Sequence, residues 1–469
     1  MVDFYFTKIN YIFTKMYKNF THLFFLPILL AIVFVAEAQK KVVVPTEKID
    51  SLLLHFEKHD RIKGSLSIFQ NGKEVYLKSF GQPQQSESPT LYQIGSVTKL
   101  FTAVLIFDLI EKKRLDLQTS LATFYPQMPQ AEKITVQHLL EHKSGLGDYT
   151  QKEDSLFWLV GKKWEETAIL EEIKKQGVQF EAGTQTAYSN SAYFLLVGIL
   201  EKIHQKPYYQ ILNQKIETVL KPTSERLLSA QEPNWARLKA EKVFNSYEYK
   251  GDTKEWTLIE DFEFANVVGV GDLAASPTTL NRLMVALFEG SLLEPSSLEK
   301  MLPTADEPTF GRGLMRIPFY QIRYWGHGGD TYGTHTILAY QPENQTSIAL
   351  CVNAQRYSHN ELMIGVLSQL HSVAFELPDF KPLLSYTENE LQAYEGTYSS
   401  EDFPLQIKIW VEAGALRGQA TGQPDFPLLS YQKDVFEFEL AKLKLHFEPQ
   451  KDKMTLYQAG MAIEMQRQR

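Results

Sequence analysis

The segment 97–110 constrains the fold of this chain more than any other feature, because it is apolar on nearly every side of the helix that its pattern predicts. A helix of this kind cannot lie on a protein surface and must be enclosed by other elements. A chain of 469 residues can bury a core of that size without disulfides. We therefore expect a large globular domain built around this helix.

Strand patterns occur on both sides of a helical middle. Two apolar runs within 65–78 are separated by Asn71-Gly72, which is a strong hairpin signal. Further helices are predicted in the middle of the chain and further strands near 350 (helices 193–203 and 278–288; strands 320–340 and 347–352). The polar stretch 221–265 gives no clear element. This order predicts an α+β fold, in which one antiparallel sheet takes strands from both ends.

The pattern changes after residue 382. Polar and apolar residues alternate through 390–469 with short turns between the runs, which predicts a small β-meander domain, either open or closed into a barrel. We expect three parts: a signal peptide at 1–38, a main domain at 39–380 and a small β domain at 385–469.

The N-terminus has the order of a secretory signal. An uncharged apolar run at 23–36 follows three lysines and precedes a small-x-small cleavage pattern ending at Ala38 (Lys8, Lys15 and Lys18). Fourteen residues fall short of the ~20 that span a bilayer. We expect cleavage after Ala38 and a secreted or periplasmic protein. The alternative is an uncleaved membrane anchor, and the true start is either Met1 or Met16.

Charge and cysteine content exclude several classes of function. The net charge of -8 argues against a nucleic-acid partner, since phosphate binding requires a basic surface. The single cysteine, Cys351, excludes an intramolecular disulfide and any Cys-rich metal centre. No cofactor is implied.

Ser96 and Lys99 stand at the start of the apolar helix, within Gly95-Ser96-Val97-Thr98-Lys99. A spacing of three places both side chains on one helix face, and burial would lower the pKa of the lysine so that it can act as a base. This is the chemistry of an activated serine nucleophile. The same spacing also occurs by chance, at Ser297/Lys300 and Ser430/Lys433.

Two further motifs follow. Tyr188-Ser189-Asn190 precedes an apolar helix, where a tyrosine can relay a proton and an asparagine amide can hold a carbonyl; the alternative is that Asn190 or Ser191 is only an N-cap. The segment 325–330, Trp-Gly-His-Gly-Gly-Asp, begins a strand pattern, and its glycines would let a substrate lie along the strand edge. The alternative there is a turn.

The order Ser-x-x-Lys, Tyr-x-Asn, His-x-Gly resembles the serine β-lactamase and penicillin-binding family. Tyr-x-Asn is similar to the branch of class C β-lactamases, D-alanyl-D-alanine carboxypeptidases, D-aminopeptidases and related esterases. The stretches LYQIGSVTKLFTAV, ITVQHLLEHKSGLGDY, FEAGTQTAYSNSAYFLLVGILEK and WGHGGDTYGTHT are similar to that family over about residues 45–375. Segment 394–398 resembles the start of the lipocalin-like domain that some members carry.

The resemblance implies a β-lactamase-like fold and a role for each motif residue. Ser96 would be the acylated nucleophile, and Lys99 and Tyr188 would share the proton transfers. Asn190 would orient the substrate and Lys99. The backbone amides of Ser96 and Asp330 would form the oxyanion hole. The implied function is a secreted serine hydrolase that acts through an acyl-enzyme on an amide or ester. Its substrate would be a small molecule or peptide, and cell-wall fragments are among the candidates. The alternative is an inactive protein of the same fold that binds cell-wall fragments.

One departure concerns the third motif, where His327, Gly328 and Gly329 would contact substrate. β-Lactamases usually have a lysine where His327 stands, and that lysine is a permanent cation for a substrate carboxylate. Histidine ordinarily titrates near neutrality. We therefore expect carboxylate binding to weaken as the pH rises through about 6 to 7.

A remote alternative is a zinc peptidase. His138-Leu139-Leu140-Glu141-His142 matches H-x-x-E-H, and on a helix its two histidines could share a metal. Against this, Ser144-Gly145 ends the helix at once, and the two leucines fit a core face.

Overall fold

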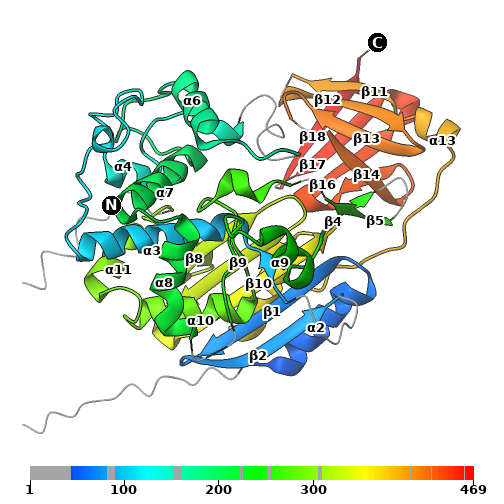
Figure 1. Ribbon diagram of the computed structural model, residues 1–469. Helices are drawn as coiled ribbons and strands as arrows, with labels where there is room; N and C mark the ends of the chain where they lie inside the picture. Colours follow the sequence, from blue (N-terminus) through cyan, green and yellow to red (C-terminus); the bar gives the residue numbers. More distant parts are fainter. Residues whose placement is uncertain are drawn as a thin grey trace, which may run out of the picture. The chain divides into compact units, whose positions relative to one another are not determined.

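One mostly antiparallel sheet, in which only the short β4–β10 pairing is parallel, organises the main domain of the computed structural model (Figure 1). The structure describes residues 44–81, 90–151, 161–221, 223, 225–250, 255–260, 262–304, 309–401, 403–423, 425–458 and 460–468. The sheet has the order β2-β1-β10-β9-β8-β7, and β4 and β5 extend it beside β10. Its strands are β1 Ile62–Gln70, β2 Lys73–Phe80, β4 Ser246–Lys250, β5 Glu255–Ile259, β7 Met315–Phe319, β8 Ile322–Asp330, β9 His335–Gln341 and β10 Thr346–Gln355.

Strands from the two ends of the domain meet at the centre of this sheet. β1 pairs with β10 in antiparallel register, with Leu66 opposite Leu350. Side chains alternate between the two faces of a strand, and both faces of β10 are buried. Ile348 and Leu350 join one core cluster, whereas Ala349 and Cys351 join the other. The sheet is therefore the middle of three layers, as an α+β fold requires.

Helices cover both faces of the sheet. α2 and α12 pack on the face of Leu350, while α3, α7, α8 and α10 build the larger cluster on the other face. α3 is buried along almost its whole length, which its all-apolar sequence predicts. The helices are α2 Thr46–Lys58, α3 Thr98–Glu111, α4 Val136–Leu140, α6 Glu166–Gln176, α7 Asn190–His204, α8 Tyr208–Leu220, α9 Trp235–Lys242, α10 Pro277–Phe288, α11 Pro295–Met301, α12 His359–Leu370 and α13 Glu388–Gln392.

The C-terminal strands close into an eight-stranded barrel with neighbours in sequence order, drawn in orange and red in Figure 1. Its interior has a core cluster of its own, which includes Ile407, Leu445 and Met465. This up-and-down closure is the arrangement of lipocalins. The strands are β11 Gly396–Ser400, β12 Phe403–Glu412, β13 Ala415–Ala420, β14 Asp425–Gln432, β15 Val435–Phe438, β16 Leu443–Glu448, β17 Lys453–Gln458 and β18 Met461–Arg467.

The predicted α+β fold with a small C-terminal β domain is confirmed. The stretch 221–265, which gave no clear element, contains α9 and the hairpin β4–β5. The predicted signal peptide at 1–38 lies outside the described residues, and the domain limits at 380 and 385 stay predictions. Among the described residues, we find no helix with the length and apolar character needed to cross a membrane.

Candidate active site

Ser96 lies where the chain turns from the short strand β3 (Tyr92–Gln93) into the core helix. It is the middle residue of a single 3-10 turn, Gly95–Val97, that leads directly into α3. Gly95 has φ +51°, and a Cβ there would lie 2.8 Å from the Asp330 amide nitrogen, so this position requires glycine. Ser96 is only partly buried, whereas its neighbours are buried.

Lys99 is fully buried one helical turn after Ser96. Its Nζ donates to Ser96 Oγ at 3.0 Å and to the Val270 carbonyl at 2.9 Å. Burial lowers the pKa of Lys99 to about 7, and the charge of Asp148 acts in the opposite direction. The amine is therefore neutral in a large fraction of molecules at pH 7 and can accept a proton from the serine.

The other two Ser-x-x-Lys sites lack this arrangement. Ser297 is buried within α11, but Lys300 is exposed to solvent. Ser430 lies in the barrel strand β14 and donates to the Gln432 carbonyl at 2.9 Å. Only at Ser96 does a buried lysine meet a partly exposed serine within the described structure.

Tyr188 completes a group around Lys99. The Lys99 ammonium lies 5.0 Å from the centre of the Tyr188 ring, and the ring stacks on the buried His142 at 4.4 Å. Burial raises the pKa of the Tyr188 hydroxyl above its usual value, and the charges of Asp148 and Asp330 add to this, while the neighbouring Ser96 hydroxyl opposes it. The phenol is therefore protonated at neutral pH and suits proton donation more than proton abstraction.

Asn190 lies beside this group but differs from expectation in its partners. It is the first residue of α7, whose N-cap is Ser189 and not Asn190 or Ser191. Its Nδ2 donates to Asp148 Oδ2 at 3.1 Å and to Thr150 Oγ1 at 2.7 Å. The expectation that Asn190 orients Lys99 is not met, because the hydrogen bonds of Lys99 go to Ser96 and Val270.

His327 is 3% exposed, and its state differs from the expected one. Its Nδ1 contacts the Gly328 carbonyl, and since a carbonyl only accepts, Nδ1 bears the proton. Burial lowers the pKa of His327 to about 4, and the charge of Lys99 contributes in the same direction. The prediction of titration between pH 6 and 7 is therefore wrong: the imidazole is neutral there and provides no cation for a carboxylate.

The strand β8 brings Gly329 and Asp330 against the turn that holds Ser96. Pairing with β7 ends at Gly326, so from His327 onward β8 has β9 on one side only. A Cβ at Gly329 would lie 3.0 Å from the Ser96 amide nitrogen. The chain segments that hold the Ser96 and Asp330 amides are thus in backbone contact, which suits two donors facing one developing oxyanion.

A cavity of about 320 Å³ opens over Ser96. Tyr188, Asn190 and Asp330 line it, whereas Lys99, His327, Gly328 and Gly329 do not. The remaining lining residues are Thr150, Phe262, Val267, Val270, Gly271, Thr331 and Tyr332. Among the described residues that line the cavity there is no lysine or arginine, and the one charged side chain is that of Asp330.

The H-x-x-E-H segment is not arranged as a zinc peptidase site. α4 ends at Leu140, and His142 follows with φ +57°, so the two histidines do not share one helix face. His138 Nδ1 accepts from the Thr135 amide, and His142 Nδ1 accepts from the Ser189 amide at 3.0 Å. In the described part of the chain, neither belongs to a cluster of three ligating side chains. His142 instead packs against Tyr188.

Sequence reasoning missed Asp148 and the segment that supplies Val270. Asp148 holds both the backbone and side-chain amides of Asn190, and it stands at the end of the family-like run SGLGDY. The Val270 carbonyl lies in the glycine-rich stretch 269–272, Gly-Val-Gly-Asp. The two runs were the available signals in the sequence. Neither run has a residue spacing that indicates which of its atoms faces the site.

Comparisons with known proteins agree with this geometry. The family described as Beta-lactamase matches residues 49–365. Penicillin-binding protein PbpX of Bacillus subtilis is 25% identical over 325 residues, which are 68% of this chain and 77% of that protein. Teichoic acid D-alanine hydrolase of Staphylococcus aureus is 23% identical over 265 residues, which are 55% of this chain and 61% of that protein.

A solved structure has the same fold over the main domain. D-amino acid amidase from Ochrobactrum anthropi SV3, complexed with D-phenylalanine, superposes with a TM-score of 0.60 and 23% identity. The match covers 70% of this chain and 99% of that one. Because the family match extends over most of the chain, it decides the assignment: the chain belongs to the β-lactamase family and is a serine hydrolase.

Proposed function

We propose that this protein releases a D-amino acid, such as D-alanine, from an amide or ester in which its amino group is free. The observation that supports a hydrolytic mechanism most strongly is the 3.0 Å contact between the buried Lys99 Nζ and the partly exposed Ser96 Oγ. The inactive binding protein weighed as an alternative is not supported, because serine and base are both present and in contact.

The proposed reaction has two stages. Ser96 Oγ attacks the carbonyl carbon while its proton passes to the neutral Lys99, and the Ser96 and Asp330 amides hold the oxyanion. The leaving amine or alcohol takes a proton through Tyr188 and departs, which leaves the acyl group on Ser96 Oγ. Water then attacks the ester with the same groups in reverse roles, and the D-amino acid and free serine result.

Two features of the cavity favour a substrate with a free amino group on the transferred amino acid over a substrate with a free carboxylate. The described lining has the Asp330 carboxylate but no lysine or arginine, and His327 is neutral above about pH 5. Phe262 and Tyr332, whose ring centres lie 5.5 Å apart, provide an apolar wall for a side chain. The relatives named D-alanine hydrolase and D-amino acid amidase also take their names from D-amino acids.

A substrate panel tests this proposal. We expect kcat/KM to be higher for D-alanyl p-nitroanilide and D-alanyl esters than for their N-acetylated forms, for a D-Ala-D-Ala peptide and for nitrocefin. The expected ratio of kcat/KM is about tenfold, which corresponds to about 1.4 kcal/mol. Equal rates with and without the free amino group would contradict the proposed substrate class but not the hydrolase assignment.

His327 gives a second prediction. Because burial keeps the pKa of His327 at about 4, its charge does not change between pH 5 and 8. The pH profiles of kcat/KM for wild type and His327→Asn should therefore have the same shape over that range, with both neutral and anionic substrates. A fall between pH 6 and 7 that is present in wild type and absent from His327→Asn would show that the imidazole titrates there.

We also propose that the protein is exported after cleavage at Ala38. The basic, apolar and small-residue order of 1–38 supports this, and so does the likeness to relatives named for penicillin and teichoic acid, which concern the cell wall. The division into a hydrolase domain at 39–380 and a β domain at 385–469 is part of the same proposal, supported by the separate core cluster of the barrel.

A further inference from the structure

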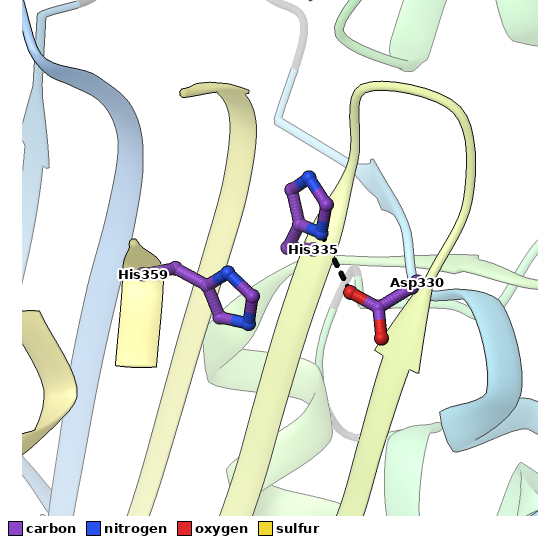
Figure 2. A group of neighbouring side chains, drawn as sticks. All are labelled: Asp330, His335 and His359. Atoms are coloured by element: carbon purple, nitrogen blue, oxygen red, sulfur yellow. Dashed lines mark hydrogen bonds and ion pairs between the residues drawn. The ribbon is translucent and has the colours of Figure 1, made fainter. Parts of the chain in front are cut away.

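We propose that Asp330, His335 and His359 form a binding site for a divalent transition-metal ion such as Zn²⁺, next to the serine machinery and sharing Asp330 with it. One ligating atom of each residue lies within 4.8 Å of the others. Figure 2 shows the Asp330 carboxylate and the two imidazoles beside one another, at the end of β8, the start of β9 and the start of α12, and the two imidazole rings are stacked with their centres 4.7 Å apart. Two imidazoles and a carboxylate, with a fourth position left for water, are a ligand set that zinc accepts.

The sheet register places the first two ligands. Asp330 ends β8, His335 begins β9, and the two are directly opposite each other in the antiparallel pair. The turn between them is closed by a hydrogen bond from the Thr331 amide to the Thr334 carbonyl at 2.9 Å. Opposed residues project from the same face of a sheet, so His335 Nδ1 reaches Asp330 Oδ1 at 2.6 Å. An ion with bonds of ~2.0–2.1 Å would replace this hydrogen bond.

The third ligand, His359, is held in place by Gln355. His359 Nδ1 donates to Gln355 Oε1 at 2.9 Å, and the His359 amide donates to the same oxygen at 3.2 Å. Both contacts require an acceptor, so Gln355 presents its carbonyl oxygen and Nδ1 bears the proton. Nε2 then has a free lone pair. A carbonyl oxygen that accepts from one ring nitrogen, and so fixes the tautomer, is typical of metal-binding histidines.

The site lies between two cavities. Asp330 lines the catalytic cavity, and His335 lines a second cavity of about 260 Å³ together with Gly333 and Gln355. A bound ion would therefore be accessible to solvent. It would change the charge at the rim of the catalytic cavity from negative to positive. This consequence for substrate rests on the proposed function, whereas metal binding itself does not.

The direct test is titration of the metal-free full chain with ZnSO4 by isothermal calorimetry, with thermal unfolding in parallel. We expect one ion per chain and a rise in Tm. His359→Ala should abolish both, and Gln355→Ala should weaken binding by about 10–100-fold because it removes only the acceptor that orients the His359 ring. Nonspecific binding of zinc to the surface would not be abolished in His359→Ala and weakened in Gln355→Ala.

His59→Ala is the matched control, since His55 and His59 form another pair of neighbouring histidines, with ring centres 4.8 Å apart. It should bind zinc as wild type does. The proposal is overturned if wild type binds no zinc, if His359→Ala binds as wild type does, or if His59→Ala removes the site.

Activity gives a separate readout. If the substrate bears a free ammonium group, zinc should raise KM about five-fold in wild type, by charge repulsion at the cavity rim, and leave KM unchanged in His359→Ala. Zinc binding without any change in KM would retain the site and contradict only its charge effect on substrate. An enzyme without activity on D-alanyl substrates would contradict the proposed function and leave the calorimetric test valid.

Discussion

Replacing Ser96 with alanine should lower kcat/KM by about 10⁴-fold or more on every substrate that the protein turns over. The reason is that Ser96 Oγ is the only atom proposed to bond covalently to the acyl group. The measurement is kcat/KM with a D-alanyl p-nitroanilide or ester, together with labelling by a serine-reactive acylating probe. Ser96→Ala should fold, because Ser96 is partly exposed and alanine fits its place.

Ser297→Ala is the matched control for that experiment. Ser297 stands in the same Ser-x-x-Lys spacing but within α11, where Lys300 is exposed. Its activity and labelling should equal those of wild type. Labelling that persists in Ser96→Ala and disappears in Ser297→Ala would move the nucleophile to the second motif.

Replacing Lys99 with methionine should lower kcat/KM by about 10²–10⁴-fold, the usual contribution of a general base. Burial lowers the pKa of Lys99 to about 7 in the free enzyme. Only the neutral amine accepts the serine proton, so wild-type kcat/KM should rise with pH through about 7 and level off above it. In Lys99→Met the residual activity should lose this rise.

Two further variants separate proton transfer from charge. Lys99→Arg retains a positive charge that cannot be titrated, so it should be as inactive as Lys99→Met if the amine acts as a base. Lys300→Met, in the second motif, should behave as wild type. An active Lys99→Arg enzyme, or a wild-type profile that is flat from pH 6 to 8, would contradict the role of Lys99.

Most of the fold could be predicted because its strongest elements are encoded locally. The apolar character of 97–110 on nearly every side predicts a buried helix, and Asn71-Gly72 between apolar runs predicts the hairpin β1–β2. The alternation after residue 390 predicts the strands of the barrel, but closure depends on β11 pairing with β18, which no local pattern contains. Likewise, α9, β4 and β5 form in a polar stretch, where β4 pairs with β10 and Trp235 of α9 packs against two core clusters.

The candidate site could likewise be predicted only in part. The Ser96–Lys99 contact follows from helical spacing, so the sequence predicts it. The Asn190 side chain donates to Asp148 and Thr150, which lie 42 and 40 residues earlier in the chain. No sequence pattern indicates that residues so far apart meet. The charge state of His327 depends on burial between segments far apart in sequence, which is why its ordinary pKa was a poor guide.

The most direct test of the account is to trap the acyl-enzyme. The full chain is mixed with a D-alanyl ester, quenched in acid during turnover and digested, and the peptides are analysed by mass spectrometry. We predict that the peptide containing Ser96 gains the mass of one alanyl group, and that this adduct is absent from Ser96→Ala and present in Ser297→Ala. Turnover of the ester with the adduct on another peptide, or with an adduct that survives in Ser96→Ala, would contradict the assignment of Ser96 as nucleophile.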